Sequence, residues 1–226
     1  MQIDITTRPG NSAARVSLDA GETITAEGGA MIAMSGNVSV ETTTQKRDSG
    51  SILGALKRMV TGESFFLNHF TPSGEGGEVY FGTVMAGDMM EYQLDGPGLL
   101  VQGGSFVASA PSVNMDIQWQ GFGKSFFSGE SMFLIHLSGN GPIIFNSFGA
   151  IYPIQVNGEY IVDTGHIVAF EESLNYVIEK AGGSWLSAIM GGEGLVCKFQ
   201  GQGTVWCQSH NAGSFGQALG PMLKHQ

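Results

Sequence analysis

The sequence predicts an all-β protein of a single domain, residues 1–226, made of three internal repeats with about four strands each. Short apolar runs bounded by glycine recur along the chain, and the sequence contains 35 glycines. Hydrophobic residues make up 42% of the sequence and charged residues only 13%. We expect a sandwich-like or barrel-like core of the double-stranded β-helix type, with one or two short helices. The repeats are predicted at about residues 1–82, 83–149 and 150–210, followed by a tail, residues 211–226.

The first repeated unit is a pair of short strands separated by glycine. Gly29, Gly104 and Gly165 each stand four residues before an alanine, with apolar residues between. A glycine within strand-like sequence marks a bulge, a sharp bend or a close approach of another backbone. Its recurrence in one column predicts a corner built into every repeat.

The second repeated unit is an apolar run that begins at Gly-Glu. Residues 62–70 resemble residues 129–137, and a copy shorter by one residue occupies 192–199. A Gly-x-Gly turn then leads into another apolar run. These turns are residues 74–76, 139–141 and 201–203. Apolar runs separated by such turns predict strands joined by hairpins.

The repeats also decide between helix and strand for one ambiguous segment. Residues 173–180 have helical propensity, yet they occupy the column in which residues 37–40 and 113–117 alternate with a period of two. We therefore predict a strand there.

Four segments are candidates for helices. The clearest is residues 51–60, which Ser49 or Ser51 can cap and which Gly62 follows. Short helical turns are expected at residues 122–127 and 184–190. A closing helix is expected over residues 215–223, ended by Pro221.

The charge balance excludes one class of function. Ten Lys and Arg residues against twenty Asp and Glu residues give a net charge of −10. A surface that follows nucleic-acid phosphates needs clustered basic residues, so nucleic acid is not an expected partner.

The sequence also argues against a membrane span. Residues 131–158 lack charged side chains, but Gly139-Asn140-Gly141-Pro142 interrupts them. The start, Met1–Ile5, alternates polar and apolar residues as a strand does, rather than as a signal peptide does. With only two cysteines there is no disulfide framework. We expect a cytoplasmic protein.

The strand at residues 132–137 is apolar on both faces. Such a strand is covered on both sides, by a second sheet, by glycine-rich loops or by a partner subunit. Burial within the chain and self-association both explain the pattern. The partner expected is a second copy of this chain, in a homo-oligomer for which a trimer is favoured.

No residue is assigned to catalysis or to a cofactor. The Gly-x-Ser-x-Gly, Ser-x-x-Lys and Walker motifs are absent. His69 and His136 share one repeat column, in which the third copy has Lys198. Together with His166 they are candidates for a metal, but their spacing fits no zinc motif. A structural role for them is preferred, so no metal is expected.

Two cysteines near the end of the chain are a further candidate pair. Cys197 and Cys207 are equally distant from Gln202, the centre of the last predicted hairpin turn. We therefore expect them opposite each other across two strands, either packed as thiols or joined in a regulatory disulfide.

Several motifs together resemble a known family. They are the run 62–69 (Gly-Glu-Ser-Phe-Phe-Leu-Asn-His), the segment Trp206–Ser209, and Gly28-Gly29 within the tripled pattern. Over essentially its whole length the chain resembles the altered-inheritance-of-mitochondria-24 (mitochondrial biogenesis) family. This resemblance implies an all-β fold like that of the tryptophan RNA-binding attenuation protein, with internal repeats and oligomerisation. It supplies no catalytic or ligand-binding residues.

The expected function is a non-enzymatic β-scaffold that self-associates and binds a protein partner. The alternative is a small-molecule-binding or metal-binding barrel of the cupin type that uses His69, His136 or His166. Peripheral membrane binding through residues 125–127 is a weaker option, because the acidic net charge opposes binding to anionic lipid. Whether the histidines point inward and converge distinguishes the scaffold from the barrel.

Overall fold

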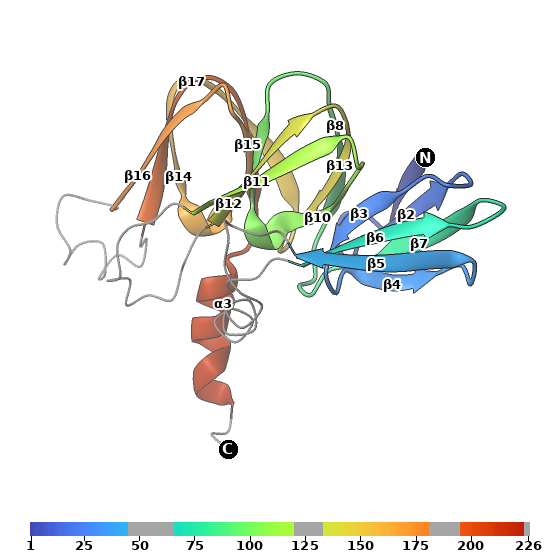
Figure 1. Ribbon diagram of the computed structural model, residues 1–226. Coiled ribbons are helices and arrows are strands. Elements are labelled where there is room, and N and C mark those ends of the chain that lie inside the picture. Colours follow the sequence, from blue (N-terminus) through green and yellow to red (C-terminus); the bar gives the residue numbers. More distant parts are fainter. Residues whose placement is uncertain (45–65, 120–132, 181–194, 224–226) are drawn as a thin grey trace, which may run out of the picture.

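The computed structural model describes residues 1–44, 66–119, 133–180 and 195–223, and the prediction of an all-β, sandwich-like or barrel-like fold is confirmed (Figure 1). The predicted helix at residues 51–60 and the turns at 122–127 and 184–190 lie outside these residues.

The strands follow one another in three parts of the chain. The first part contains β1 (Gln2–Thr6), β2 (Ala13–Leu18), β3 (Ile24–Glu27), β4 (Met31–Met34), β5 (Val38–Thr44), β6 (Phe66–Pro72) and β7 (Gly77–Phe81). The second contains β8 (Met89–Leu94), β9 (Leu99–Gln102), the 3-10 turn η1 (Gly103–Ser105), β10 (Phe106–Ser109), β11 (Val113–Trp119), β12 (Phe133–Gly139) and β13 (Gly141–Asn146). The third contains β14 (Ile151–Asp163), the 3-10 turn η2 (Thr164–His166), β15 (Ile167–Glu171), β16 (Asn175–Lys180) and β17 (Leu195–Gln208), then α3 (Ala212–Leu219) and the 3-10 turn η3 (Gly220–Met222).

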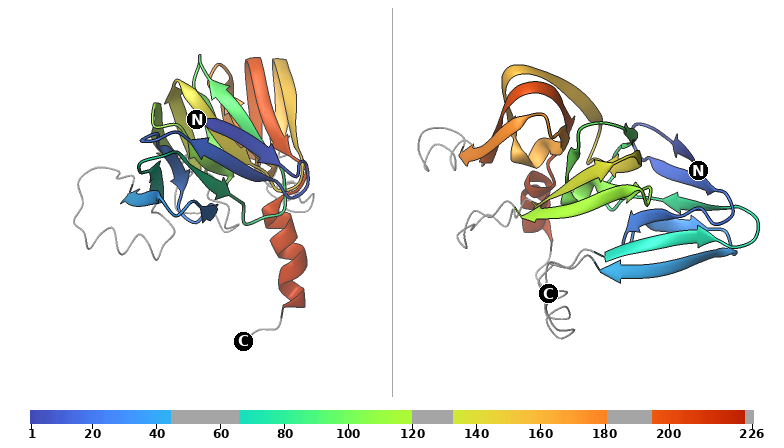
Figure 2. Two further views of the ribbon diagram at one scale, coloured as in Figure 1. Left: turned by 90° about the vertical axis from the view of Figure 1, so that its right-hand side faces the viewer. Right: turned by 45° about the horizontal axis from the view of Figure 1, so that its top comes forward.

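These strands form three antiparallel sheets. A four-stranded sheet has the order β1-β2-β7-β4, and a six-stranded sheet the order β5-β6-β3-β10-β13-β8. The third sheet runs β11-β12-β9-β15-β17-β14, and β16 also pairs with β17. The N-terminal strands lie at one end of the molecule and the β14–β17 strands at the other (Figures 1 and 2).

One pairing scheme recurs in the three parts of the chain. Each part contains a first set of three paired strands, which is β2-β7-β4 in the first part, β8-β13-β10 in the second and β14-β17-β15 in the third. Each part also contains a second set, which is β3-β6-β5, β9-β12-β11 and β14-β17-β16 in the same order. In the third part the long strands β14 and β17 belong to both sets. That these units superimpose under a rotation, with the boundaries given above, stays a prediction.

Adjacent parts of the chain share a continuous sheet. The first part joins the second where β3 pairs with β10, with Ala26 opposite Ala108. The second joins the third where β9 pairs with β15, with Val101 opposite Ala169.

The shared strands are buried on both faces. Leu134 of β12 belongs to the hydrophobic core of the third part, while its neighbour Ile135 belongs to the central core. In β10, Phe106 faces the central core and Val107 the core of the first part. The two-sided burial predicted for the strand at 132–137 is therefore confirmed for Leu134, Ile135 and Leu137, and other strands of the same chain supply the cover.

The predicted hairpins at the Gly-x-Gly turns are wrong. β6 and β7 lie in different sheets, and so do β12 and β13, so these glycines carry the chain from one sheet to another. At residues 201–203 the chain does not reverse, because β17 continues and pairs with β14 on both sides of the bend. A positive φ at Gly139 (105°) and at Gly201 (128°) explains why glycine occupies these bends.

Two predicted elements of the last part are confirmed. The strand predicted at residues 173–180 is β16, which pairs with β17 from Asn175 to Lys180. The closing helix is α3, and it begins earlier than predicted, because the Asn211 side chain accepts a hydrogen bond from the Ser214 N–H and caps it. Figure 2 shows α3 projecting away from the sheets.

A buried carboxylate ties the first part of the chain to the second. Asp88, which is 2% exposed, accepts hydrogen bonds from Arg8 Nε at 2.9 Å and Arg8 Nη2 at 2.8 Å. The Ser12 hydroxyl and the Met89 N–H donate to it as well, each at 2.9 Å. Burial alone would raise the pKa of Asp88, but these hydrogen bonds outweigh it and hold the pKa below the usual value.

We expect Asp88→Asn to lower the free energy of unfolding by roughly 2–4 kcal/mol near neutral pH, since a broken buried pair costs about 3–5 kcal/mol and Arg8 is half exposed here. Because the folded-state pKa is lowered, the wild-type advantage exists above the unfolded pKa of 3.8 and disappears as the pH falls through the folded pKa. Urea unfolding at several pH values measures this.

Glu78→Gln is the matched control, because Glu78 forms an exposed ion pair with Arg15 at 2.7 Å. Such a pair contributes no more than about 1 kcal/mol. Equal losses for the two variants would contradict the role given to Asp88.

Candidate functional site

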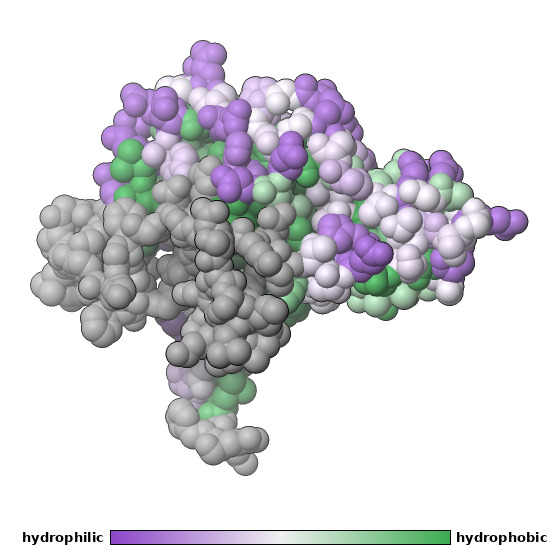
Figure 3. All heavy atoms as spheres, viewed as in Figure 1, coloured by the Kyte–Doolittle hydropathy of each residue, from purple (hydrophilic) through white to green (hydrophobic). Residues whose placement is uncertain are grey.

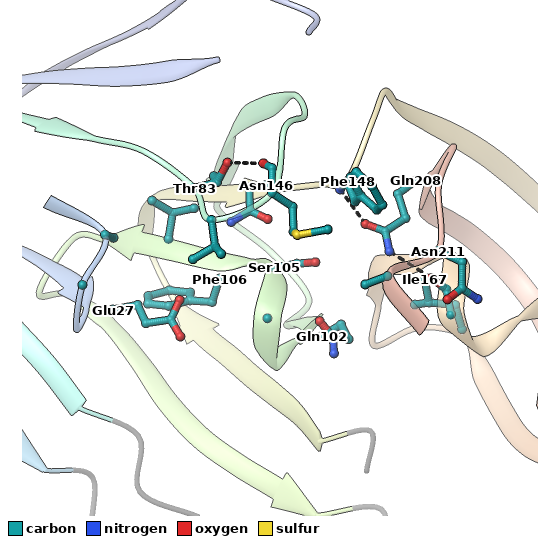
Figure 4. A pocket seen from close by; sticks show the side chains of 18 of the residues that line it. Glu27, Thr83, Gln102, Ser105, Phe106, Asn146, Phe148, Ile167, Gln208 and Asn211 are labelled. Atoms are coloured by element: carbon teal, nitrogen blue, oxygen red, sulfur yellow. Dashed lines mark hydrogen bonds between the residues drawn. The ribbon is translucent and has the colours of Figure 1, made fainter. Parts of the chain in front are cut away.

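The three glycine corners border one open pocket of about 770 Å³ (Figure 4). Residues 27–32 line it from the first part of the chain, Gln102 and residues 104–107 from the second, and Thr164, Gly165 and Ile167 from the third. Gly29, Gly104 and Gly165, predicted as corners, lie where the chain leaves one set of strands and enters the next. A register shift follows each corner, at Met31/Ala33, Phe106/Ala108 and Ile167/Ala169.

The glycines at these corners are required for different reasons. Gly29 has a φ of +95°, in the region that favours glycine. At Gly165 an added Cβ would overlap the amide end of the Asn211 side chain, so a larger residue would displace the side chain that caps α3. The recurring glycine thus meets a conformational demand at one corner and a steric demand at another.

Among the described residues that line the pocket, Glu27 is the ionisable one. It ends β3, and its half-buried side chain lies beside Phe106 (Figure 4). None of the described residues donates a hydrogen bond to its carboxyl group. Removal from water without a compensating donor favours the neutral acid, and burial raises the pKa of Glu27 to about 7.

A pattern in the sequence indicates the position of Glu27, although it was not among the predicted site residues. Glu27, Gln102 and Asp163 each stand two residues before the repeated glycine, so the same column holds a polar residue three times. Gln102 also lines the pocket, whereas the Asp163 carboxylate accepts a hydrogen bond from the Gly165 N–H at 2.7 Å.

The far side of the pocket is held by Gln208. Its amide Nε2 donates to the Gly165 carbonyl at 2.9 Å, and its Oε1 accepts from the Phe148 N–H at 2.8 Å (Figure 4). With both ends of its amide engaged, Gln208 fixes this wall of the pocket.

The structure does not bring the candidate histidines together. His69 lies between two threonines, with Nδ1 2.9 Å from Thr25 Oγ1 and Nε2 2.8 Å from Thr43 Oγ1. His166 Nδ1 lies 2.8 Å from the Gln208 carbonyl oxygen, to which it donates. Each of these rings is bound by its own neighbours.

His136 instead forms a hydrogen bond with a carboxylate. Its Nε2 lies 2.6 Å from Glu172 Oε2. Hydrogen bonds from the Gly98 backbone and from His136 lower the pKa of Glu172. Lys198, the residue in the same column of the third copy, pairs with Glu159 at 2.9 Å. Within the described part of the chain, no group of three or more His, Cys, Asp or Glu side chains is placed to hold a metal ion.

The predicted cross-strand cysteine pair is wrong. Cys197 and Cys207 both lie on β17, which continues through the residues expected to form the turn. Cys197 stands opposite Val162 and Ile178, and Cys207 opposite Tyr152 and Ile167. Both are buried free thiols, and burial raises the pKa of Cys197 to about 12 and that of Cys207 to about 11.

Glu27→Gln is expected to stabilise the protein above pH 7. Because the folded-state pKa is raised from 4.5 to about 7, wild-type stability falls as the pH rises between these values. The variant has no charge to bury, so it should exceed the wild type by roughly 2–3 kcal/mol at pH 8 and match it near pH 4.5. Denaturant unfolding at both pH values measures the difference. Equal pH profiles would contradict a half-buried Glu27 that has no hydrogen-bond donor among the described residues.

The described residues contain no helix with the length and apolar character needed to cross a membrane.

Comparison with known proteins assigns the chain to a family. An uncharacterized protein of Streptococcus pyogenes serotype M6 is 29% identical over 209 residues, which cover 90% of this chain and 84% of that protein. The X-ray crystal structure of a Streptococcus pyogenes protein matches with a TM-score of 0.81 and 26% identity, over 98% of this chain and 99% of that one. The likeness to the tryptophan RNA-binding attenuation protein stays a prediction. The family described as mitochondrial biogenesis AIM24 matches residues 3–210, and the chain therefore belongs to this family.

Proposed function

We propose that this protein is a non-enzymatic β-scaffold that self-associates and binds a protein partner. It has no assigned catalytic residue, and we place it in the reducing environment of the cytoplasm, which its two free cysteines fit.

Strand β4 is the observation that carries the proposal. Its apolar side chains are exposed, with Met31 at 40%, Ile32 at 60% and Met34 at 39%. Figure 3 shows hydrophobic residues at the surface of the N-terminal sheet, on the side where β4 lies in Figure 1. Among the described residues β4 pairs only with β7, so its other edge is open. A strand with both exposed apolar side chains and an open edge favours association with another chain.

The alternative of a cupin-like barrel is less well supported. It needed His69, His136 and His166 to converge, and each of them has separate partners. Within the described part of the chain, the pocket around Glu27 remains as its structural support.

Self-association predicts a native mass of at least twice the 23.9 kDa of one chain at micromolar concentration. Ile32→Glu should shift the protein toward the monomer, because association would then bury an unpaired charge. Native mass spectrometry and light scattering measure both masses.

Val177→Glu is the matched control, since Val177 on β16 is also 60% exposed. It should leave the mass unchanged. A wild-type mass of one chain would overturn the proposed self-association.

A further inference from the structure

At each join between parts of the chain, the edge strand of one part pairs with the edge strand of the next. β3 meets β10 at the first join, and β9 meets β15 at the second. One strand of each join lies just before a glycine corner, and the other lies just after the next corner along the chain.

Two edges of the same kind are left over. Among the described residues, β4 pairs only with β7, and residues 159–163 of β14 pair only with β17. β4 follows the first glycine corner, as β10 and β15 follow the second and third. Residues 160–162 precede the third corner as β3 and β9 precede the first and second.

Side-chain exposure separates the joined strands from the leftover ones. On β10, Phe106 is 0% and Val107 1% exposed, whereas Met31 and Ile32, at the same distances from their corner, are 40% and 60% exposed. An apolar residue type thus recurs at these positions, and β4 alone leaves it uncovered.

The leftover edge of β14 shows the same contrast. Leu99 and Leu100 of β9 are 0% and 6% exposed. Tyr160 and Ile161, which occupy the same positions before the third corner, are 45% and 53% exposed. Both leftover edges therefore carry apolar side chains of the type that their counterparts bury in a join.

We propose that β4 of one copy pairs, antiparallel, with residues 160–162 of β14 in a second copy of this chain. The register follows from the β15–β9 join, where Ala169, Phe170 and Glu171 stand opposite Val101, Leu100 and Leu99. Transferred to the leftover edges, it places Ala33, Met34 and Ser35 opposite Val162, Ile161 and Tyr160 of the second copy. This inference rests on the proposed self-association and names its interface.

The pairing joins copies head to tail. β4 and β14 lie at opposite ends of the molecule, so one chain does not close on itself (Figures 1 and 2). The two surfaces differ, and such a contact gives a ring if the rotation between copies closes and a filament if it does not. Each contact completes one more sheet of the kind already present inside the chain.

The double variant Met34→Cys/Ile161→Cys tests the register. Cβ atoms of directly opposed residues on antiparallel strands lie about 4.5–5.5 Å apart, close enough for a disulfide to form with a small adjustment. Mild oxidation should produce a ladder of covalent multimers on non-reducing gels, and reduction should remove it. The native thiols should not interfere, because they are buried and burial raises their pKa values to about 12 and 11.

Three controls define the contact. Each single variant should give no ladder, because each new cysteine faces an unchanged residue. Met34→Cys/Val177→Cys should also give none. Val177 stands opposite Lys198, which stands opposite Ile161, so Val177 on β16 lies two strands away from the proposed contact on β14. Circular dichroism of all variants checks that they fold.

The outcomes distinguish a failure of the proposed β4–β14 interface from a failure of the proposed self-association. A ladder from the double variant alone supports the head-to-tail join. A covalent dimer of the Met34→Cys single variant would show two β4 strands in contact and overturn it. A native mass above one chain without a ladder would overturn this interface and leave the scaffold standing, whereas a monomeric wild type would overturn both.

Discussion

The structure depends on strands that are buried on both faces at once. Leu134 and Ile135 are neighbours on β12, yet they belong to different hydrophobic cores, and Phe106 and Val107 do the same on β10. A strand of this kind leaves no polar face for water, so each part of the chain needs a neighbour to cover it. The three hydrophobic cores are therefore coupled through shared sheets.

This coupling explains why the edge strands at the two ends of the molecule carry exposed apolar side chains. An inner join buries the side chains of both strands, but the first and last parts each have a neighbour on one side only. β4 and residues 160–162 of β14 keep the apolar side chains of a joining strand without a join within the described chain. Open edges of this composition lead to association, and the proposed scaffold uses that tendency.

Asp88 and Glu27 show what determines the ionisation of a carboxyl group in this fold. Asp88 is buried with four hydrogen-bond donors, so it stays ionised and holds the start of β8 to the N-terminal loop. Glu27 has no donor among the described residues, and its pKa is raised to about 7. Burial alone therefore does not decide the charge of a carboxyl group here; the donors placed around it do.

The sequence by itself determined the local elements. The all-β class, the strand at β16, the closing helix and the two-sided burial of Leu134, Ile135 and Leu137 follow from period, propensity and repeated columns. Only the tertiary structure decided which strands pair, because a Gly-x-Gly segment bends equally well into a hairpin or into the next sheet. For that reason Cys197 and Cys207 lie along one strand rather than across two. The pocket likewise depends on three corners that are far apart in the sequence and line one open cavity, and the raised pKa of Glu27 depends on its burial there. No short stretch of sequence contains that information.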